Sequence, residues 1–309
     1  MKRQHRLLAF VVVAAVGITL AACGDDDDDT STGSESATKE GPAITVAAQD
    51  FGESKILAEI YAQALANEGF DAKTKSVSGN RQVLFGAFES GDVNMAPEYV
   101  ASQLNFLEAG AATSDVTESL DKLKPLLEDK GLVAFEPSDA VDTNVFVMLK
   151  DTADEKGIET LSDLAEKGSD LKMGAPQDCS ENAFCIPGLK SVYGVDMSSN
   201  FTPLDPGLIL SSLDGKAIDV GVLFSTDSRL TDDKYLVLED DKHMSAADNV
   251  FPVATKELSD AYGSDLADVL NSVSAKLTTD GLLELNKSFD VDHEDADDIA
   301  KKWLEDNGF

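Results

Sequence analysis

After Gly41 the chain alternates short apolar runs with longer segments whose apolar residues recur at helical spacing. The runs at residues 44 to 48 and 93 to 96 are typical of strands buried in a sheet. Between them, residues 52 to 68 have the pattern of a helix and residues 71 to 77 that of a second strand. This order of strands and helices favours a parallel sheet with right-handed crossovers. We therefore expect an α/β fold.

The stretch from residue 78 to 102 places polar and aromatic side chains at the end of one such strand. Leu84, Phe85 and Phe88 predict a helix, and the strand at 93 to 96 runs into Pro97. Proline cannot donate a ladder hydrogen bond, so we expect the strand to stop there. Glu98 and Tyr99 would then lie at its carboxyl end, where open α/β sheets bind small ligands.

The second half of the chain indicates a second lobe. Residues 132 to 136 and 145 to 149 are extended runs on either side of a segment that would cross into this lobe, and residues 249 to 253 would form the return crossing. Pro125 predicts a break or kink in a helix over residues 114 to 130. In the second lobe we expect helices at 158 to 167, 186 to 193 and 207 to 214 and strands at 171 to 174, 218 to 224 and 235 to 238.

The charge of the chain excludes some functions. With 25 Lys and Arg against 58 Asp and Glu, the formal net charge is −33, which repels nucleic acid. A solvated acidic face explains most of this charge. His243 and His293 both lie in acidic segments, and no Ser-His-Asp arrangement or Gly-rich phosphate loop is found. We therefore expect no enzymatic activity, no catalytic residues and no cofactor.

The N-terminus is typical of a bacterial lipoprotein signal. A basic start is followed by an apolar run from Leu7 to Leu20 and then by Ala21-Ala22-Cys23. Residues 1–22 are predicted to be the signal peptide, Cys23 the lipidated residue and residues 23–42 an acidic tether. The alternatives are a secretory signal or a transmembrane anchor, for which the run is short. The mature protein would be held by lipid on the outer face of the cell membrane.

The two remaining cysteines, Cys179 and Cys185, are separated by five residues. Outside the cell such a pair favours a disulfide over a metal site. The sequence offers no second Cys or His cluster to complete a zinc site, so no metal is expected.

Six short motifs follow one another along the chain: Asp50 to Ser54, Pro97 to Tyr99, Ile186 to Lys190, Leu204 to Gly207, Phe224 to Asp227 and Leu236 to Asp240. Together and in this order they resemble the glycine betaine/choline substrate-binding proteins of ABC importers. The resemblance covers residues 43 to 306 and implies a type II periplasmic-binding-protein fold with two hinge-crossing segments. Lobe 1 would comprise residues 43–143 plus 246–309, and lobe 2 residues 144–245.

The resemblance implies an aromatic cage around a quaternary ammonium group. Tyr99 and Phe224 occupy cage positions, with a packed strand end and simple core as their respective alternatives. Asn144 stands where the family tends to have an aromatic residue, so a full tyrosine cage cannot be assembled. Tyr61, Tyr193, Tyr235 and Tyr262 are expected to be structural.

Polar residues complete the predicted site. Lys55 and Ser102 match positions that hold a ligand carboxylate, although Lys55 is equally consistent with a solvated helix lysine. Phe51 belongs to the first motif, and Asn249 lies on the return crossing. The acidic rim would be formed by Asp50, Glu98, Asp142 and Asp178, each also explicable as a cap or turn residue, and Asn80 and Arg81 lie at a helix start beside the cleft.

The function that the resemblance implies is capture of a small osmolyte (glycine betaine, choline or a related quaternary amine) between two lobes and its delivery to an ABC permease. We expect the protein to act as a monomer. The alternative is a surface lipoprotein or sensor that binds a different polar or cationic solute or a partner protein.

Overall fold

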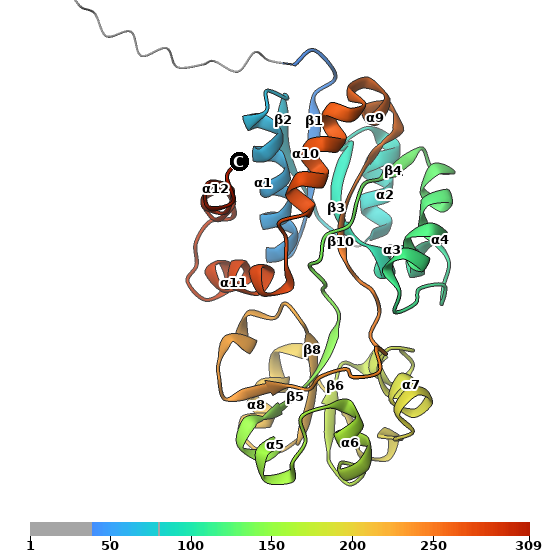
Figure 1. The fold of residues 1–309 in the computed structure, drawn as a ribbon, viewed down its shortest axis with the longest axis vertical. Coiled ribbons are helices and arrows are strands. Elements are labelled where there is room, and N and C mark those ends of the chain that lie inside the picture. The colour runs from blue at the N-terminus through green and yellow to red at the C-terminus, as the bar shows by residue number, and fades with distance from the viewer. Residues whose placement is uncertain (1–38, 80) are drawn as a thin grey trace, which may run out of the picture. The chain divides into compact units, whose positions relative to one another are not determined.

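The computed structural model describes residues 39–79 and 81–309 (Figure 1). The signal peptide, Cys23, most of the tether and Asn80 lie outside the described residues, so the predictions made for them stay predictions. Across the described ranges, the structure contains no helix long and apolar enough to cross a membrane.

The first lobe is built on a five-stranded mixed sheet in the order β2-β1-β3-β10-β4. Strands β1, β2 and β3 are parallel, as expected, but β10 runs antiparallel to β3 and β4. The parallel arrangement predicted for the strands within residues 44 to 96 is therefore confirmed, and β10, which enters from the return crossing, makes the sheet mixed. The strands are β1 (Ile44–Gln49), β2 (Ala72–Val77), β3 (Met95–Tyr99), β4 (Leu132–Ala134) and β10 (Val250–Thr255).

Strand β3 continues through Pro97 to Tyr99, so the predicted stop at Pro97 is wrong. Pro97 pairs with Pro252 of β10, and neither residue has an N–H to donate. The register of β1 with β3 contains only the pair Val46 and Met95. Pro97 therefore lies beyond the part of β3 that pairs with β1, so its missing N–H removes no hydrogen bond between these two strands. All five residues of β3 are buried, which fixes Tyr99 at the carboxyl end of a central strand.

Helices cover both faces of this sheet (Figure 1). Val46 belongs to the hydrophobic cluster that includes residues of α1, α10 and α12, whereas its neighbour Ala47 belongs to the cluster with residues of α2, α3 and α4, because successive strand residues face opposite sides. The hydroxyl groups of Tyr61 and Ser274 lie 2.9 Å apart and tie α1 to α10. The helices are α1 (Gly52–Asn67), α2 (Arg81–Ser90), α3 (Val100–Leu107), α4 (Val116–Glu128), α9 (Lys256–Tyr262), α10 (Ser264–Ser274), α11 (Thr279–Asp290) and α12 (Ala296–Asn307).

Helix α4 is not broken at Pro125, contrary to that part of the prediction. Its first turn is capped by the Asp115 side chain, which accepts a hydrogen bond from the Glu118 N–H. Leu120, Leu123 and Leu127 are buried on one face and hold the helix against the core on both sides of the proline. Packing of this face outweighs the one hydrogen bond that Pro125 removes.

The second lobe carries a five-stranded sheet in the order β7-β6-β8-β5-β9. Strand β7 and helix α5 were not anticipated, because β7 has three residues and α5 is polar on most positions. Cys179 and Cys185 form a disulfide with Cα atoms 5.2 Å apart. The elements are β5 (Asn144–Leu149), β6 (Met173–Ala175), β7 (Phe201–Pro203), β8 (Val220–Phe224), β9 (Tyr235–Val237), α5 (Lys150–Lys156), α6 (Leu161–Lys167), α7 (Ile186–Gly188) and α8 (Pro206–Asp214).

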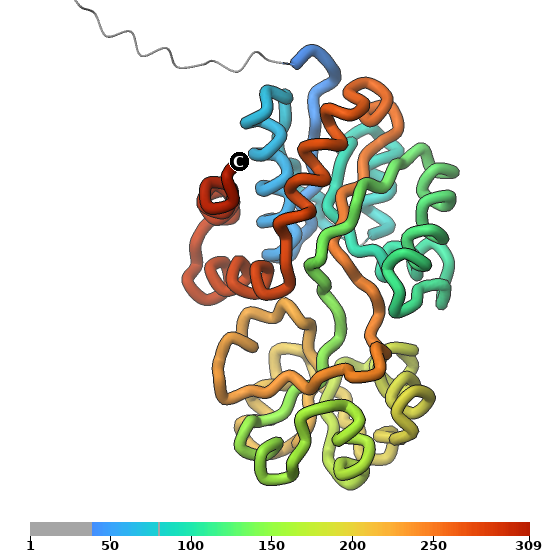
Figure 2. The backbone as a smooth tube through the Cα atoms, in the orientation of Figure 1, coloured from blue at the N-terminus to red at the C-terminus, as the bar shows by residue number. Residues whose placement is uncertain are grey.

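Two segments connect the lobes, and Figure 2 shows them running side by side. They are joined by the Val141–Asn249 bridge and by a hydrogen bond of 3.1 Å from the Asp142 N–H to the Asp248 carbonyl oxygen. A paired two-segment connection of this kind is the geometry of a hinge. The acidic side chains of Asp142 and Asp248 thus lie where the chain passes between the lobes.

Candidate functional site

A cavity of about 780 Å³ lies between the two lobes. The first lobe contributes the start of α1, the end of β3 and the end of α11. The second lobe contributes Phe224 at the end of β8 and the turn that follows, which includes the short 3₁₀ helix η4 (Ser228–Thr231). The carboxyl ends of β1, β3 and β8 therefore all point toward the same space, as expected for ligand sites in open α/β sheets.

Aromatic rings form the apolar part of the cavity wall. Phe51 is 43% exposed and Phe224 is 52% exposed, and both line the cavity. With Val291, they are three of the eight large hydrophobic side chains that are exposed among the described residues. The ring of Tyr99 lies with its centroid 6.4 Å from that of Phe51. The cavity thus concentrates apolar surface that a solute could cover.

Tyr99 is held in place by a buried carboxylate. Its side chain is only 6% exposed, yet it lines the cavity, and its hydroxyl donates to Glu53 Oε1 at 2.6 Å. Glu53 Oε2 accepts a hydrogen bond of 2.6 Å from Asn286 Nδ2. Burial raises the pKa of Glu53, despite these hydrogen bonds, and also raises the pKa of Tyr99. The tyrosine is consequently a neutral donor whose ring is fixed by the hydrogen bond.

Two further carboxylates come from the crossing segments, Asp142, which is half-buried, and Asp248, which is buried. Asp142 Oδ1 accepts from the Thr226 hydroxyl at 2.9 Å, and burial together with the charge of Glu53 raises the pKa of Asp142 well above its usual range. Asp248 accepts hydrogen bonds from the Ser102 N–H and hydroxyl. Burial raises the pKa of Asp248 to about 6. Desolvation therefore opposes the ionisation of both carboxyl groups, whereas a nearby cation would favour their ionised forms.

The two arginines of the cavity wall are each paired with a carboxylate. Arg81 contacts Glu98 through Nε and Nη2, with Nη2 2.8 Å from Oε2, and Glu98 is completely buried. Arg229 contacts Asp227 in the same two-pronged manner, with Nη2 2.6 Å from Oδ2. Against these two guanidinium groups the wall carries five carboxylates, those of Glu53, Asp142, Asp227, Asp248 and Asp290.

The structure brings some of the predicted site residues together. Tyr99, Phe224, Phe51 and Ser102 line the cavity, as do Arg81 and Asp142 of the predicted rim. The other four tyrosines are not among the lining residues. Tyr61 is buried in the core, whereas Tyr193 donates to Asp240 of the second lobe.

The remaining predicted residues lie elsewhere than on the cavity wall. Lys55 is half-buried on α1, and Asp50 is exposed after β1. Glu98 lies behind Arg81, and Asn249 donates to the Ser138 carbonyl oxygen at 2.9 Å. Asn144 pairs with Phe224 at the start of β5, and Asp178 is exposed in the disulfide loop.

Several lining residues were missed by the sequence reasoning. Glu53 belongs to a motif that was recognised, but its burial beneath Tyr99 could not be read from the motif. Asp248 directly precedes Asn249 on the return crossing. Asn286 and Asp290 are four residues apart on α11 and so share a face of that helix. Only this i, i+4 spacing was available as a signal, and it does not indicate what the face contacts.

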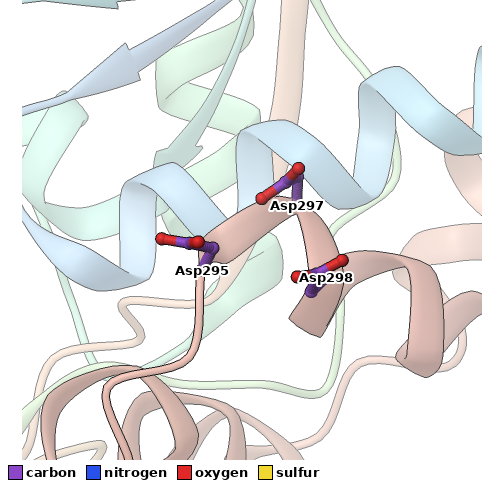
Figure 3. Close-up of side chains that lie close together, drawn as sticks. All are labelled: Asp295, Asp297 and Asp298. Carbon is purple, nitrogen blue, oxygen red and sulfur yellow. The ribbon is translucent and has the colours of Figure 1, made fainter.

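A second acidic cluster is found on the surface at the start of α12 (Figure 3). Carboxylate oxygens of Asp295, Asp297 and Asp298 all lie within 4.8 Å of one another, and all three residues are exposed. Asp295 is the N-cap residue, and the other two belong to the first turn. Carboxylates in this position stabilise a helix through its dipole. The cluster is therefore explained by the helix, without a metal ion.

Comparison with known protein families identifies the same architecture. Residues 42–306 match the model of the family described as the substrate binding domain of ABC-type glycine betaine transport system. This match covers most of the chain, and it confirms the resemblance found in the motifs.

Individual relatives are more distant in sequence. A glycine-betaine-binding protein of Pseudomonas aeruginosa is 26% identical over 271 residues, covering 84% of this chain and 86% of the relative. A carnitine transport binding protein of Listeria monocytogenes is 23% identical and covers all of this chain and 98% of the relative.

Solved structures agree with the two-lobed fold. A crystal structure of a glycine betaine/carnitine/choline ABC transporter protein superimposes with a TM-score of 0.74 at 25% identity, covering 85% of this chain and 98% of that chain. Apo YehZ from Escherichia coli gives a TM-score of 0.73 at 23% identity, covering 87% and 99%, respectively.

Proposed function

The chain belongs to the family of substrate-binding domains of ABC-type glycine betaine transport systems, and on this basis we propose that its cavity captures a quaternary amine for an ABC permease. Members of this family bind solutes and are not enzymes. The candidate ligands are glycine betaine, choline and related compounds, which are named in the descriptions of relatives.

The observation that carries the proposal is the exposure of Phe51 and Phe224 beside Tyr99 in an acidic cavity. A quaternary ammonium group has no N–H to donate, so a protein can hold it only with ring faces and negative charge. Each suitable ring contributes about 0.5–2 kcal/mol, depending on its desolvation. Three rings and the nearby carboxylates supply both kinds of contact.

Ligand binding would favour closure of the lobes around the hinge. The Asn286 side chain donates to the Thr226 carbonyl oxygen at 2.9 Å, and the Ser228 hydroxyl donates to Asp290 at 3.2 Å. Both hydrogen bonds join the first lobe to the second at the cavity edge. A solute that contacts both lobes would stabilise the closed arrangement in which these hydrogen bonds form. Closure would then be a shift in the populations of open and closed states and would involve no covalent chemistry.

The proposal includes a lipid anchor at Cys23 and an acidic tether over residues 23–42, which would hold a monomeric receptor on the outer face of the membrane near its permease. The sequence pattern at residues 1–23 supports this part. Within the proposed site we include Tyr99, Phe224, Phe51 and Ser102, together with the lining residues Glu53, Asp142 and Asn286.

Thermal unfolding with a panel of solutes tests the proposal. Glycine betaine, choline, carnitine, proline, ectoine and polyamines are each added to the purified protein. A ligand at 100 times its Kd adds about 2.7 kcal/mol to the free energy of unfolding, so a quaternary amine should raise the Tm clearly. If no quaternary amine raises the Tm and a partner protein does, the receptor function is contradicted.

A further inference from the structure

The two lobes meet at a second place besides the crossing segments. Helix α11 of the first lobe packs against the short helix η4 of the second, where the Ser228 hydroxyl donates to Asp290 at 3.2 Å. Asn286 lies one turn before Asp290 on the same face of α11, and its amide group donates to the Thr226 carbonyl oxygen at 2.9 Å. Hydrogen bonds between α11 and the turn around η4 therefore join the lobes at the edge of the cavity.

Asn286 also holds the carboxylate that positions Tyr99. Its Nδ2 donates to Glu53 Oε2 at 2.6 Å, and Glu53 Oε1 accepts the hydrogen bond of the Tyr99 hydroxyl. An amide nitrogen has two N–H groups, so the bonds to Glu53 and to the Thr226 carbonyl oxygen use both of them. The same amide group thus connects the Glu53–Tyr99 pair of the first lobe to the backbone of the second.

These hydrogen bonds are shielded from water. Asn286 is 7% exposed, Glu53 6% and Thr226 4%. Asn286 Oδ1 is buried without a hydrogen-bond partner, so the amide group is held through Nδ2 alone and has no donor or accessible acceptor left for a ligand. A hydrogen bond in such surroundings is electrostatically stronger than one in water, and its loss leaves a buried group unpaired.

The chain of hydrogen bonds continues to the hinge. The Thr226 hydroxyl donates to Asp142 Oδ1 at 2.9 Å, and Asp142 belongs to one of the two crossing segments. Five residues are connected in this way, in the order Tyr99, Glu53, Asn286, Thr226 and Asp142. A rotation about the crossing segments that separates the lobes would move α11 away from η4 and break the bond between Asn286 and Thr226.

We propose that Asn286 is a positioning residue that couples closure of the lobes to the ligand site. Its amide group holds the Glu53–Tyr99 pair and the second lobe at the same time, and it acts through closure instead of by contact with the ligand. This coupling rests on the proposed function, because it matters only where the cavity captures a solute. It adds to that function the residue on which the closed arrangement depends.

The expected effect follows from the populations of the open and closed states. Loss of one buried hydrogen bond lowers the ratio of closed to open protein by about three- to tenfold. Since only the closed state holds the solute with both lobes, the apparent affinity falls by up to the same factor. The factor is the same for every solute, because Asn286 contacts none of them. A side chain that touched the ligand would instead change the preference between solutes.

Small-angle X-ray scattering of the ligand-free protein tests the role of Asn286 in closure. Asn286→Leu has a side chain of similar size without N–H groups, and we expect it to have a larger radius of gyration than the wild type. Asn307→Leu is the matched control, because the Asn307 amide donates to the Trp303 carbonyl oxygen near the C-terminus. The control should scatter like the wild type. An unchanged radius of gyration in Asn286→Leu would contradict a role in closure.

Calorimetric titration with choline and with glycine betaine tests the coupling to the ligand. We expect Asn286→Leu to weaken the binding of both solutes by the same factor, about three- to tenfold, and Asn307→Leu to leave both affinities unchanged. Affinities within twofold of wild type would overturn the coupling, even if the lobes open. A changed preference between the two solutes would show contact with the ligand and contradict an action through closure.

The outcomes separate this coupling from the proposed function. If the solutes bind the wild-type protein and Asn286→Leu neither opens the lobes nor weakens binding, the coupling is wrong and the proposed function stands. If neither solute binds the wild-type protein, the proposed function fails, and the scattering comparison alone decides whether Asn286 holds the lobes closed.

A second variant keeps the coupling testable if Asn286→Leu does not fold. Ser228→Ala removes the hydrogen bond to Asp290 between α11 and η4 and leaves the bonds of Glu53 in place. We expect a smaller opening of the lobes and a loss of affinity of about two- to threefold for both solutes. Absence of both effects would show that the contact between α11 and η4 does not hold the lobes together, and the coupling would be overturned.

Discussion

Two acidic clusters of this protein differ in their surroundings and therefore in their chemistry. Asp295, Asp297 and Asp298 are exposed at the start of α12, where water solvates their charges. Glu53 is buried and Asp142 half-buried at the cavity, where hydrogen bonds from hydroxyl and amide groups replace much of the water. Similar residue types thus lie at the positive end of a helix dipole in one region and line the proposed ligand cavity in the other.

The difference shows that carboxylate number alone does not define a binding site. Desolvation raises the pKa of both Glu53 and Asp142, so each gains free energy when a positive charge approaches. An exposed carboxylate gains little from the same cation, because water and salt screen the interaction. Four changes test this contrast, from the largest expected effect to the smallest.

Removing the carboxyl group of Glu53 should have the largest effect. Glu53→Gln keeps the shape of the side chain but removes a buried group whose ionised form a bound cation would favour, and we expect the affinity for choline to fall about 30-fold or more. Titration calorimetry at pH 7.5 measures the change. An affinity within twofold of wild type would show that Glu53 only positions Tyr99 and does not attract the ligand.

Acidification should weaken binding by up to about tenfold between pH 7.5 and pH 5. The pKa of Asp248 is raised by burial to about 6, so this group is ionised at the higher pH and mostly protonated at the lower. A bound cation favours the ionised form, and affinity is therefore lost as the pH falls through this value. The groups that interact with Asp248 include Ser102, Arg81 and Glu98, together with Asp142 on the other crossing segment.

Asp248→Asn is the control for the pH effect. The variant should bind more weakly at pH 7.5 and show a flatter pH profile, with the remaining slope due to Glu53 and Asp142, whose pKa values are also raised. Tighter binding at pH 5 than at pH 7.5 in the wild type would contradict the attraction of cations by these carboxylates.

Loss of one exposed ring should have a smaller effect. Phe224→Ala removes about 1 kcal/mol of cation–π interaction, which corresponds to about a fivefold loss of affinity. Phe106→Ala is the matched control, because Phe106 is another exposed phenylalanine and does not line the cavity. Equal losses in the two variants would exclude a ligand contact at Phe224.

Neutralising the surface cluster should leave ligand affinity unchanged. The triple variant Asp295→Asn, Asp297→Asn, Asp298→Asn removes three exposed charges and weakens only the interaction with the dipole of α12. We expect a loss of about 1 kcal/mol in the free energy of unfolding, measured with urea. A change in choline affinity above twofold would show that the surface charge itself attracts the ligand.

The sequence was sufficient for the fold class and for the strand ends that carry Tyr99 and Phe224. Short apolar runs between helical patterns predicted the alternation of elements, and the motifs predicted two lobes with paired crossings. It was insufficient for the direction of β10, because a run of apolar residues has no direction until its partners are known. Three-residue strands such as β7 are also too short to produce a periodic pattern.

The candidate site was predicted only in part, because much of it depends on contacts between residues distant in sequence. Asn286 reaches Glu53 across 233 residues, and no local pattern indicates that contact. Lys55 and Asp50 were placed in the site by their neighbours in a motif, but Lys55 lies on α1 and Asp50 in the turn before that helix, and neither lines the cavity. Local spacing predicts elements and their ends, whereas the assignment of donors to acceptors requires the folded structure.

Proton release on ligand binding tests the central claim most directly. The protein is titrated with choline at pH 6 in buffers of different ionisation enthalpy, where Asp248 is partly protonated. We expect saturable binding at one site with net release of a fraction of a proton, because the cation drives the buried carboxylates to ionise. Absence of binding, or binding with no proton release or with proton uptake, would contradict the account.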